Sequence, residues 1–402
     1  DAAGYVAPPE CAESTGKNIA VVGGGPGGLS AAYFLQLMGH QVTVYEMLPK
    51  LGGMLRYGIP NYRLPKERLD DDIQAILDTG VKVDCGKAIG KDYSIVDLKE
   101  KYDAVLITIG ASTDKKLGLE GEDAKGVVSA VQFLRDVGHG TQESLEGKEV
   151  AVIGGGNVSM DAVRTSVRLG AKKVSIVYRR RVADMTALSD EISGAEAEGV
   201  EIKTLMAPSR IEKDEEGNVK GIWVTPQMIS NIKGGRASVK PTGEDDVFIP
   251  CQTLIVAIGQ DIEYQHFEEA GVPVQRGKIN VEKFGGFEEM PGVFAGGDCA
   301  TGPSTVISAI AAGKVIAANI DEYLGYHHEI TADVEIPEPK LEDKPACGRV
   351  NLTEREAGER VKDFEGVENC MTEKEACQEA GRCLRCDHFG YGIFKGGRDT
   401  KW

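Results

Sequence analysis

Four cysteines lie close together near the end of the sequence, and thiolates at such a spacing can bind a metal centre. Cys370, Cys377, Cys383 and Cys386 are separated by six, five and two residues. Iron–sulfur clusters and structural zinc are both commonly held by four thiolates. We predict an iron–sulfur cluster of the [4Fe-4S] type and keep zinc as the alternative, bound by the four cysteines or by cysteines with His388. A redox disulfide between Cys383 and Cys386, or a set of unliganded thiols, are the remaining interpretations.

A glycine-rich turn near the start of the chain indicates a second kind of chemistry, the binding of a dinucleotide. An apolar segment, 19–22, leads into Gly23, Gly25 and Gly28, which have the G-x-G-x-x-G spacing. The first glycine allows the tight bend, the second lets a pyrophosphate approach the backbone, and the third allows close packing of helix and strand. Glu46 ends the next predicted strand, where an acid accepts hydrogen bonds from a ribose. The phosphates would lie at the helix N-terminus, where unpaired N–H groups favour negative charge.

A second turn of the same kind follows in the middle of the chain. The strand 150–153 leads into the turn 154–157, and Ser159 takes the place of the third glycine, which we expect to loosen helix packing slightly. The next strand ends in an arginine run, 179–181, where the first unit has an acid. An acid at this place binds the ribose 2′-hydroxyl of NAD, whereas an arginine accommodates the 2′-phosphate of NADP. The sequence therefore favours NADP(H) over NAD(H), with a solvated basic turn as the alternative.

A third strand end is also a candidate part of a cofactor site. The pattern of residues 291–299 predicts a strand that ends in Gly296, Gly297 and Asp298, and a helix from Val306 follows. An aspartate at such a position can bind a ribityl hydroxyl, and a helix N-terminus can stabilise negative charge on a reduced flavin. We therefore predict a flavin at the first turn, with an ordinary turn as the alternative for these residues.

The elements that must position these residues repeat within the chain. Segments 102–110 and 252–259 both have the pattern of a buried parallel strand and both end in Ile-Gly, so each closes a unit that began with a glycine-rich turn. Residues 48–65 hold three prolines and three glycines, which indicates an irregular segment that wraps a ligand. Polar turns within 207–250 predict a small β-meander attached to the second unit.

Composition limits the class of protein. The 402 residues, with 41% hydrophobic residues and 51 glycines, indicate a globular α/β protein of two or three domains. The net charge of -17 argues against binding to nucleic acid or to an anionic membrane surface, and no apolar run is long enough to predict a transmembrane helix. We expect no signal peptide, although the sequence starts at Asp1 without a Met. We also expect a cytoplasmic location, because nine cysteines are too few for a disulfide scaffold.

These patterns predict a fold of two Rossmann-like dinucleotide-binding domains of the α/β class, one inserted in the other, with a small Cys-rich tail. The predicted parts are an N-terminal arm at 1–16, a FAD-binding domain at 17–112 and 263–327, an NAD(P)H-binding domain at 113–262, a linker at 328–347, and a Cys-rich iron–sulfur tail at 348–402.

Taken together, the motifs resemble the glutamate synthase small-subunit family of FAD- and NADPH-binding flavoproteins. The same module occurs in dihydropyrimidine dehydrogenase and in the NADP-binding subunit of bifurcating ferredoxin:NADP transhydrogenases. Members of the family usually carry an N-terminal helical domain with two iron–sulfur clusters, whereas this sequence has the cysteine-bearing tail. The resemblance covers about residues 16–330 and is carried by the segments 23–28, 52–60, 63–65, 154–157, 178–180 and 295–298.

The resemblance implies a set of residues for each nucleotide. FAD would be held by Gly23, Gly25, Pro26, Gly27, Gly28, Glu46, Gly53, Met54, Leu55, Arg56, Arg63, Ile89, Gly110, Gly297, Asp298, Ser304, Thr305 and Val306. NADP(H) would be held by Gly155, Gly156, Asn157, Val158, Arg179, Arg180, Ala257, Ile258 and Gly259. We predict no catalytic side chain, because hydride exchange between a nicotinamide and a flavin needs aligned rings rather than a protein acid, base or nucleophile.

These features predict an FAD-dependent NAD(P)H oxidoreductase, with NADPH preferred, that is a subunit of a larger complex. It would exchange a hydride between NADP(H) and FAD and pass single electrons to iron–sulfur centres, with flavin-based electron bifurcation with ferredoxin as one form of this function. The alternatives are an NADH-specific flavin reductase, an FAD-dependent disulfide or small-molecule reductase, and a scaffold that keeps its nucleotides only for assembly. A disulfide reductase is disfavoured because neither nucleotide-binding unit contains a closely spaced cysteine pair.

Overall fold

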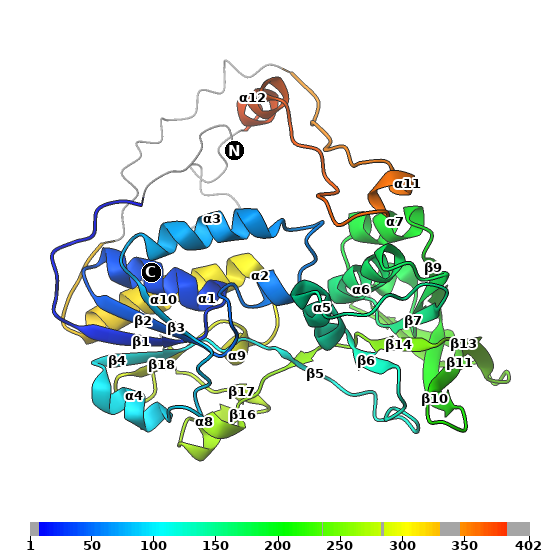
Figure 1. The fold of residues 1–402 in the computed structure, drawn as a ribbon, viewed down its shortest axis with the longest axis horizontal. Coiled ribbons are helices and arrows are strands. Elements are labelled where there is room, and N and C mark those ends of the chain that lie inside the picture. The colour runs from blue at the N-terminus through cyan, green and yellow to red at the C-terminus, as the bar shows by residue number, and fades with distance from the viewer. Residues whose placement is uncertain (1–7, 235, 283–284, 330–345, 384–402) are drawn as a thin grey trace.

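The computed structural model describes residues 8–234, 236–282, 285–329 and 346–383, which form two α/β units side by side (Figure 1). Each unit is built on a five-stranded parallel sheet, with strand order β18-β4-β1-β2-β3 in the first and β6-β14-β7-β8-β9 in the second. Strand β18, which belongs to the first sheet, comes after all the strands of the second sheet in the sequence. The predicted fold of two Rossmann-like units, one inserted in the other, is therefore confirmed.

The first unit is the N-terminal one. Its strands are β1 (Asn18–Val22), β2 (Gln41–Glu46), β3 (Lys82–Cys85), β4 (Ala104–Ile107) and β18 (Val293–Ala295). Its helices are α1 (Pro26–Leu37), α2 (Met54–Tyr57), α3 (Lys66–Leu77), α4 (Ile95–Lys101), α8 (Gln265–Glu269), α9 (Asp298–Thr301) and α10 (Val306–Tyr323), and a short hairpin joins β16 (Val274–Gln275) to β17 (Lys278–Ile279).

The second unit repeats this plan. Its parallel strands are β6 (Val127–Ser129), β7 (Glu149–Ile153), β8 (Lys173–Tyr178), β9 (Glu201–Thr204) and β14 (Thr253–Val256), and its helices are α5 (Ala130–His139), α6 (Asn157–Arg168) and α7 (Ser189–Ala197). An antiparallel sheet is attached to it, built from β10 (Met206–Lys213), β11 (Val219–Lys233), β12 (Arg236–Pro241) and β13 (Val247–Pro250). This sheet confirms the predicted β-meander.

Alternation along the strands decides what covers each face of the two sheets. In β1, Ile19 and Val21 pack under α1, α3 and α10, while Ala20 and Val22 pack against α4 and α8. In β7, Val150 and Val152 pack on the α5, α6 and α7 side, whereas the alternate residues of the strand face the antiparallel sheet. The antiparallel sheet thus does for the second unit what α4 and α8 do for the first: it buries the second face of a parallel sheet.

Between residues 8 and 329 the chain passes between the units twice, and the two passages pair with each other. β5 (Thr113–Asp114) runs out of the first unit, β15 (Gln260–Asp261) runs back, and they form a two-stranded antiparallel ladder. Figure 1 shows this ladder as the thin connection between the two units. Because the ladder is only two residues long, further contacts are needed to fix the orientation of one unit against the other.

Helices α1 and α10 pack with their backbones close together. Gly313 on α10 lies against Gly27 and Ala31 of α1, and a Cβ at Gly313 would collide with the Gly27 carbonyl oxygen. Ser30 Oγ donates a hydrogen bond across the same contact to the Ile310 carbonyl at 3.1 Å. The N-terminal ends of the two helices are held together by this contact.

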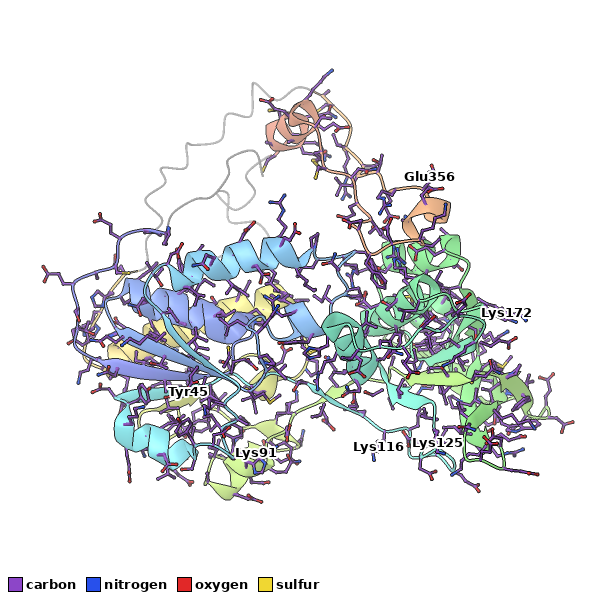
Figure 2. The ribbon with its side chains drawn as sticks, in the orientation of Figure 1. Tyr45, Lys91, Lys116, Lys125, Lys172 and Glu356 are labelled. Carbon is purple, nitrogen blue, oxygen red and sulfur yellow. The ribbon has the colours of Figure 1, made fainter. Side chains whose placement is uncertain are left out.

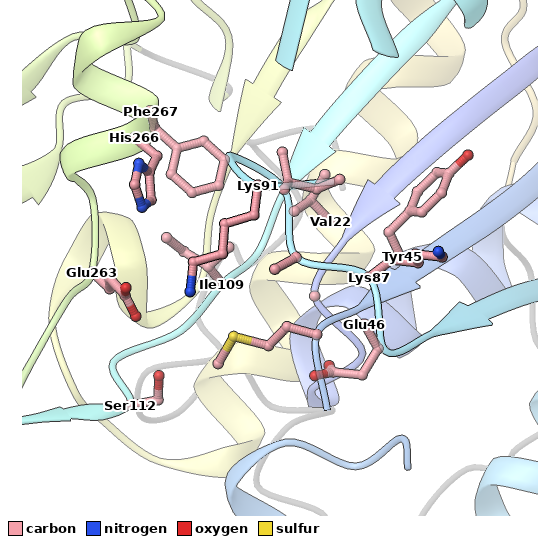
Figure 3. A pocket seen from close by; sticks show the side chains of 14 residues that line it. Val22, Tyr45, Glu46, Lys87, Lys91, Ile109, Ser112, Glu263, His266 and Phe267 are labelled. Atoms are coloured by element: carbon pink, nitrogen blue, oxygen red, sulfur yellow. The ribbon is translucent and has the colours of Figure 1, made fainter. Parts of the chain in front are cut away.

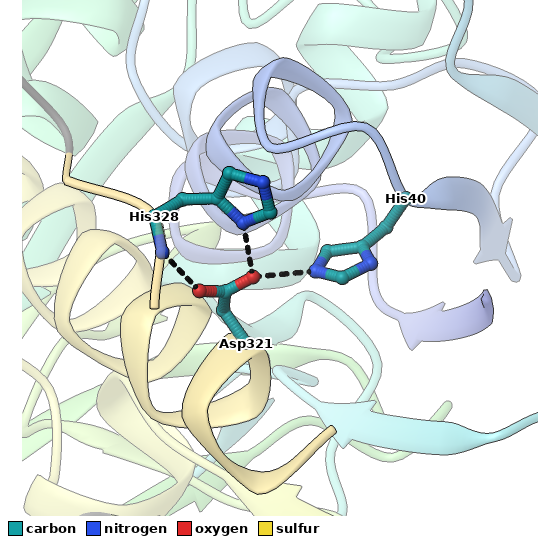
Figure 4. A group of neighbouring side chains, drawn as sticks. All are labelled: His40, Asp321 and His328. Atoms are coloured by element: carbon teal, nitrogen blue, oxygen red, sulfur yellow. Dashed lines mark hydrogen bonds and ion pairs between the residues drawn. The ribbon is translucent and has the colours of Figure 1, made fainter. Parts of the chain in front are cut away.

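A buried polar cluster joins the other ends of these two helices (Figure 4). Asp321, in the last turns of α10, is hydrogen-bonded to His40 Nε2 at 2.9 Å and to His328 Nδ1 at 2.8 Å, and it accepts the His328 backbone N–H at 2.8 Å. His40 Nδ1 is in turn 2.8 Å from Thr15 Oγ1. Burial lowers the pKa of His40, although the Asp321 carboxylate opposes this effect. The cluster ties the N-terminal arm and the segment after α10 to the core of the first unit.

The C-terminal segment contains two short helices, α11 (Ala357–Arg360), which lies beside α7 of the second unit, and α12 (Glu373–Gly381) (Figure 1). A capping box begins α12: Thr372 Oγ1 accepts the Glu375 N–H, and the Glu375 carboxylate accepts the Thr372 N–H at 2.8 Å. Within the residues that the structure describes, no helix combines the length and the apolar character that crossing a bilayer would require.

The α1–α10 contact leads to a prediction for stability. Gly313→Val puts a branched side chain against the Gly27 carbonyl, and such overpacking costs about 1–3 kcal/mol. We expect a lower melting temperature by calorimetry and weaker retention of a nucleotide at the first turn, from which α1 begins. Gly381→Ala, at the end of α12 with nothing within 4 Å of the added Cβ, is the matched control. A Gly313→Val protein as stable as the control would contradict the described packing.

Candidate functional site

The first glycine-rich turn lies between β1 and α1, and two of its glycines are required by backbone contacts. Gly23 has φ +109°, and a Cβ there would come within 2.5 Å of the Thr108 carbonyl oxygen on the neighbouring strand β4. A Cβ at Gly28 would collide with the Gly23 carbonyl and would lie 2.6 Å from Thr108 Oγ1. The first and third glycines therefore allow α1 to start directly on the sheet, as their spacing predicts.

The second glycine of the turn faces open space beside another glycine. A Cβ at Gly25 would meet nothing nearer than Gly53 Cα at 3.9 Å. Gly53 has φ +52°, and a Cβ added there would come within 2.8 Å of Gly25 Cα, so this position requires a glycine. The Gly52 N–H donates to the Gly24 carbonyl at 2.8 Å, which holds the segment 48–65 against the turn. No side chain caps the N-terminus of α1, so its first N–H groups are available to an anion at this cradle. Pro26 and Gly27 begin α1, and Met54 and Leu55 begin α2 directly after Gly53.

Glu46 ends β2 beside the turn, as predicted. Its Oε2 accepts the Gly24 N–H at 2.8 Å and its Oε1 accepts the Leu48 N–H at 2.7 Å. Burial raises the pKa of Glu46, while these backbone donors lower it. Each carboxylate oxygen keeps a second lone pair, so Glu46 can accept a hydrogen bond from a hydroxyl group as well.

A cavity of about 130 Å³ opens next to Glu46 (Figure 3). Its apolar wall includes Val22, Ile109 and Phe267, and Glu46 lies at the opposite end of the cavity from α8. It is lined by Val22, Gly23, Tyr45, Glu46, Met47, Lys87, Ala88, Ile89, Lys91, Ile109, Ser112, Glu263, His266 and Phe267. Ile89, implied by the family resemblance, thus lies in the same cavity as Glu46.

The strand end that carries Gly297 and Asp298 lies on the strand next to β4. Gly297 has φ +73°, and Asp298 begins α9, where burial raises its pKa and the Ser304 N–H lowers it. Ser304, Thr305 and Val306 are exposed at the start of α10, whose first turn is capped by the Thr305 hydroxyl. Because β18 and β1 both pair in parallel with β4, this strand end and the first turn belong to the same edge of the sheet.

Gly110 and Cys299 complete this edge. Gly110 follows β4 with φ +67° and open space around it. Cys299 is fully buried, its thiol lies 3.2 Å from the Gly296 carbonyl, and burial raises its pKa to about 12. A protonated, enclosed thiol of this kind is a poor nucleophile.

The second turn, between β7 and α6, has the same backbone contacts. Gly154 has φ +150°, and a Cβ there would collide with the Ala257 carbonyl of the neighbouring strand. Asn157 Oδ1 accepts the Leu188 N–H at 3.0 Å, and the Gly155 carbonyl accepts the Thr186 N–H at 2.9 Å, so the loop 185–188 is fixed over the turn. Gly156 and Val158 lie at the start of α6, and Ile258 and Gly259 follow β14 at the same edge, with Ile258 exposed.

The arginine run after β8 divides into two parts. Arg181 forms two hydrogen bonds with Asp184, at 2.8 and 2.9 Å, and this pairing holds the pKa of Asp184 far below its usual range. Arg180 donates from Nε to the Ala237 carbonyl at 2.9 Å, and Arg179 is exposed. The charge of Arg181 is therefore already compensated, whereas the charges of Arg179 and Arg180 remain available to an anion at the strand end.

Two arginines of the segment 48–65 are engaged within the protein. Arg56 is buried and is bonded to the Leu51 carbonyl and to Asp70. Arg63 is paired with Asp161 of α6 and with Glu191 of α7, both in the second unit. The structure thus places Arg63, which the family resemblance assigns to FAD, at the contact between the units.

The predicted metal site lies partly outside the described residues. Cys370, Cys377 and Cys383 are exposed and unpaired around α12, and Cys386 falls in the part of the chain that is not described. Among the described residues, the only group of three metal-binding side chains with converging ligand atoms is His40, Asp321 and His328. The three described thiols therefore do not converge on one point.

Two groups of interacting polar residues were not predicted from the sequence. One is the buried network around Tyr62, Asp161 and Glu198, and the other is the His40–Asp321–His328 cluster. A partial signal was present, since Asp161, Arg164 and Arg168 recur at helical spacing on a helix whose other residues are small or apolar. Charges on a helix in such surroundings indicate partners elsewhere in the fold.

Comparisons with known proteins agree with this geometry. The family model described as pyridine nucleotide-disulphide oxidoreductase matches residues 17–313. The chain belongs to this family. A fold comparison finds FprA from Mycobacterium tuberculosis at a TM-score of 0.67 and 20% identity, covering 77% of this chain and 85% of that one, which supports the fold alone.

Two curated relatives align with most of the chain. The small chain of NADPH glutamate synthase from Escherichia coli is 34% identical over 328 residues, 78% of this chain and 70% of that protein. The beta subunit of NADP(+)-dependent formate dehydrogenase from Moorella thermoacetica is 39% identical over 400 residues, 96% of this chain and 56% of that protein. The resemblance to the glutamate synthase small-subunit family is confirmed, and the chain spans little more than half the length of the Moorella relative.

The surroundings of Glu46 predict a pH dependence for FAD binding. A ribose hydroxyl donates to the carboxylate form, so bound FAD should lower a pKa that burial has raised above its ordinary 4.5. We therefore expect binding to the apoprotein to release protons, and the affinity to fall as the pH decreases through the raised pKa. Fluorescence titrations between pH 5 and 8 measure this slope.

Glu46→Gln should weaken FAD binding and remove the slope, while Glu100→Gln, at an exposed position of α4, should change neither. A slope that persists in Glu46→Gln would assign the titration to another group.

Proposed function

We propose that this chain is the FAD- and NADP(H)-binding subunit of a larger electron-transfer complex, and that it exchanges a hydride between the two nucleotides. The observation that carries the proposal is the pair of glycine-rich turns with opposite charges at the ends of equivalent strands. One turn is followed by the buried acid Glu46 and the other by Arg179 and Arg180. An acid suits a ribose and arginines suit a 2′-phosphate, so the two units are suited to different nucleotides.

The first unit has the features that FAD requires. Gly25, whose missing side chain leaves the turn open, would let a pyrophosphate approach the backbone, Glu46 would accept the ribose hydroxyls, and the cavity beside it would take the adenosine end. Asp298 and the start of α10 would hold the ribityl and flavin end. Bound FAD would supply the hydride chemistry, and the residues of this chain would bind and orient it.

The second unit would hold NADP(H) at the start of α6. Gly155 and Gly156 would face the pyrophosphate, and Asn157 would keep the loop 185–188 in place through its bond to Leu188. Arg179 and Arg180 would bind the 2′-phosphate, and residues 257–259 would lie along the nicotinamide half. We assign no acid, base or nucleophile, because orienting two rings is sufficient for this exchange.

The alternative of a disulfide reductase has less support. Cys299 is the cysteine next to the predicted flavin edge, and it is fully buried with a raised pKa. Cys85 and Cys251 belong to different units, and the pKa of each is also raised by burial. None of these thiols has the exposure and low pKa of a redox-active cysteine.

The proposal of a subunit rests on the names of the relatives, which are a beta subunit and a small chain. The finer proposals are that electrons leave to iron–sulfur centres of the complex, that the Cys-rich tail holds one of them, and that ferredoxin is a partner of a bifurcating assembly.

The arginine run leads to a prediction for nucleotide preference. Arg179→Gln combined with Arg180→Gln removes two charge-assisted bonds to the 2′-phosphate, each worth about 1.5–3 kcal/mol. We expect the KM for NADPH to rise by roughly 100-fold or more and the KM for NADH to change little. Lys173→Gln, at the exposed other end of β8, is the control. Equal effects on both nucleotides would exclude the proposed recognition of the 2′-phosphate.

The tail leads to a prediction for metal content. Protein purified under anaerobic conditions should contain iron and acid-labile sulfide, and Cys377→Ser should lower both while the flavin content stays the same. Zinc without sulfide would favour the zinc alternative, and no metal at all would contradict a metal site in the tail. The same preparation tests the main proposal, because flavin absorbance should bleach on addition of NADPH.

A further inference from the structure

Tyr62 and Arg63 project from the first unit into the second. Tyr62 is almost fully buried, its hydroxyl donates to the Asp161 carbonyl at 3.3 Å, and the Arg168 guanidinium lies 4.0 Å from its ring centre. Arg63 Nη1 donates to both Asp161 oxygens, at 2.9 and 3.1 Å, and Arg63 Nε pairs with Glu191 at 2.9 Å. Two consecutive residues of one unit are thus enclosed by helices α6 and α7 of the other.

Burying the Asp161 carboxylate at this contact costs free energy unless its charge is paired. It is 4% exposed, and burial raises its pKa to about 6 even though Arg63 and Arg164 both favour the charged form. A buried carboxylate without its partner would be strongly destabilising. The Arg63–Asp161 pair therefore specifies one arrangement of the two units, since any rotation that separates the pair leaves both charges inside the protein.

The position of Asp161 connects this pair to the nucleotide turn. Asp161 lies four residues after Asn157, which begins α6 at the second turn. Four residues of helix span about 6 Å. Such a short helical segment is rigid. A shift of Asp161 relative to the first unit therefore moves the second glycine-rich turn by a similar amount.

The C-terminal segment covers the same contact. The Val367 N–H donates to the Tyr62 carbonyl at 3.0 Å, and Asn61 Nδ2 donates to the Phe364 carbonyl at 3.1 Å. Arg360, on α11, enters the second unit and pairs with the fully buried Glu198 carboxylate at 2.7 Å. Figure 2 shows this region with Glu356, the residue before α11, at its outer side. The segment 354–369 therefore holds both units at once.

The network as a whole is electrically balanced. Glu198 also accepts Arg164 at 2.8 Å and Arg168 at 2.6 Å, and Arg164 pairs with Glu191. Its four cations and four anions are Arg63, Arg164, Arg168, Arg360, Asp161, Glu191, Glu198 and Glu354. Balance makes a buried network tolerable, but only while every member is in place.

We infer that Arg63 is a positioning residue for hydride exchange: through Asp161 and Glu191 it fixes the orientation of the NADP(H) unit relative to the FAD unit. This inference rests on the proposed function. It assigns Arg63 to the alignment of the two rings rather than to the holding of FAD. A displacement of about 1 Å at reacting atoms can reduce a rate by about 100-fold, so a residue that touches neither nucleotide can control the exchange.

The experiment compares Arg63→Gln, Arg63→Lys, Asp161→Asn and the double variant Arg63→Gln with Asp161→Asn. The double variant leaves no unpaired buried charge, so it keeps the test interpretable if a single variant does not fold. Lys213→Gln, which removes an exposed ion pair of β10, is the control. Stopped-flow absorbance gives the limiting rate of flavin reduction and the Kd for NADPH, and fluorescence titration gives the Kd for FAD.

We expect the limiting rate in the double variant to fall by about 10- to 100-fold, with both dissociation constants within about threefold of the wild type. Arg63→Lys should recover part of the rate. A raised Kd for FAD with a normal limiting rate at saturating FAD would make Arg63 a flavin ligand and overturn the inference, as would an unchanged limiting rate with unchanged affinities.

A readout without nucleotides separates this inference from the proposed function. Hydrogen exchange of the apoprotein should become faster at residues 58–66 and in α6 of the double variant, and small-angle scattering should show a wider distribution of distances between the units. Unchanged exchange and scattering would overturn the inference. If wild-type flavin is not bleached by NADPH, the proposed function fails, while this readout still decides whether Arg63 fixes the two units.

Discussion

The structure depends on the close approach of backbone to backbone at the two glycine-rich turns. At Gly23 and at Gly154 the turn lies directly against the carbonyl of the neighbouring strand, Thr108 in one unit and Ala257 in the other. No side chain fits between, so the following helix begins on the sheet itself, with its first N–H groups at the strand ends. In the proposed function, a pyrophosphate at the helix N-terminus would bring a ribose beside Glu46 in the first unit and a 2′-phosphate beside Arg179 and Arg180 in the second.

A hydroxyl group lies between the helix and the neighbouring strand at both turns. It comes from the strand side in the first unit and from the helix in the second. In the first unit the helix contributes Gly28, and the Thr108 hydroxyl from the strand fills the space and donates to the Val22 carbonyl. In the second unit the helix contributes Ser159, fully buried and 3.5 Å from the Ala257 carbonyl, and the strand contributes only the methyl group of alanine. The serine that breaks the glycine pattern thus takes the volume of the missing threonine hydroxyl.

The fold and the two glycine-rich turns could be predicted from sequence where the signal is local. Gly23, Gly25 and Gly28 stand between a strand and a helix, and Glu46 and Arg179 end the strands that follow, so a short window contains each motif. The contact between the units has no such signal, because Tyr62, Asp161 and Arg360 come from segments up to about 300 residues apart. Arg63 looked like part of a ligand-wrapping segment, and only the fold places Asp161 and Glu191 around it. The cysteine pattern likewise indicates which ligand atoms are available. It does not show whether the thiols converge on one point.

The charges at the contact between the units also bear on the part played by the C-terminal segment. The C-terminal segment brings Arg360 together with its own counterion, Glu354, so it adds one positive and one negative charge to this network. The remaining charges of α6, α7 and Arg63 balance one another without it. Removal of the segment would therefore leave the buried charges of the two units in balance, with Glu198 still paired to Arg164 and Arg168.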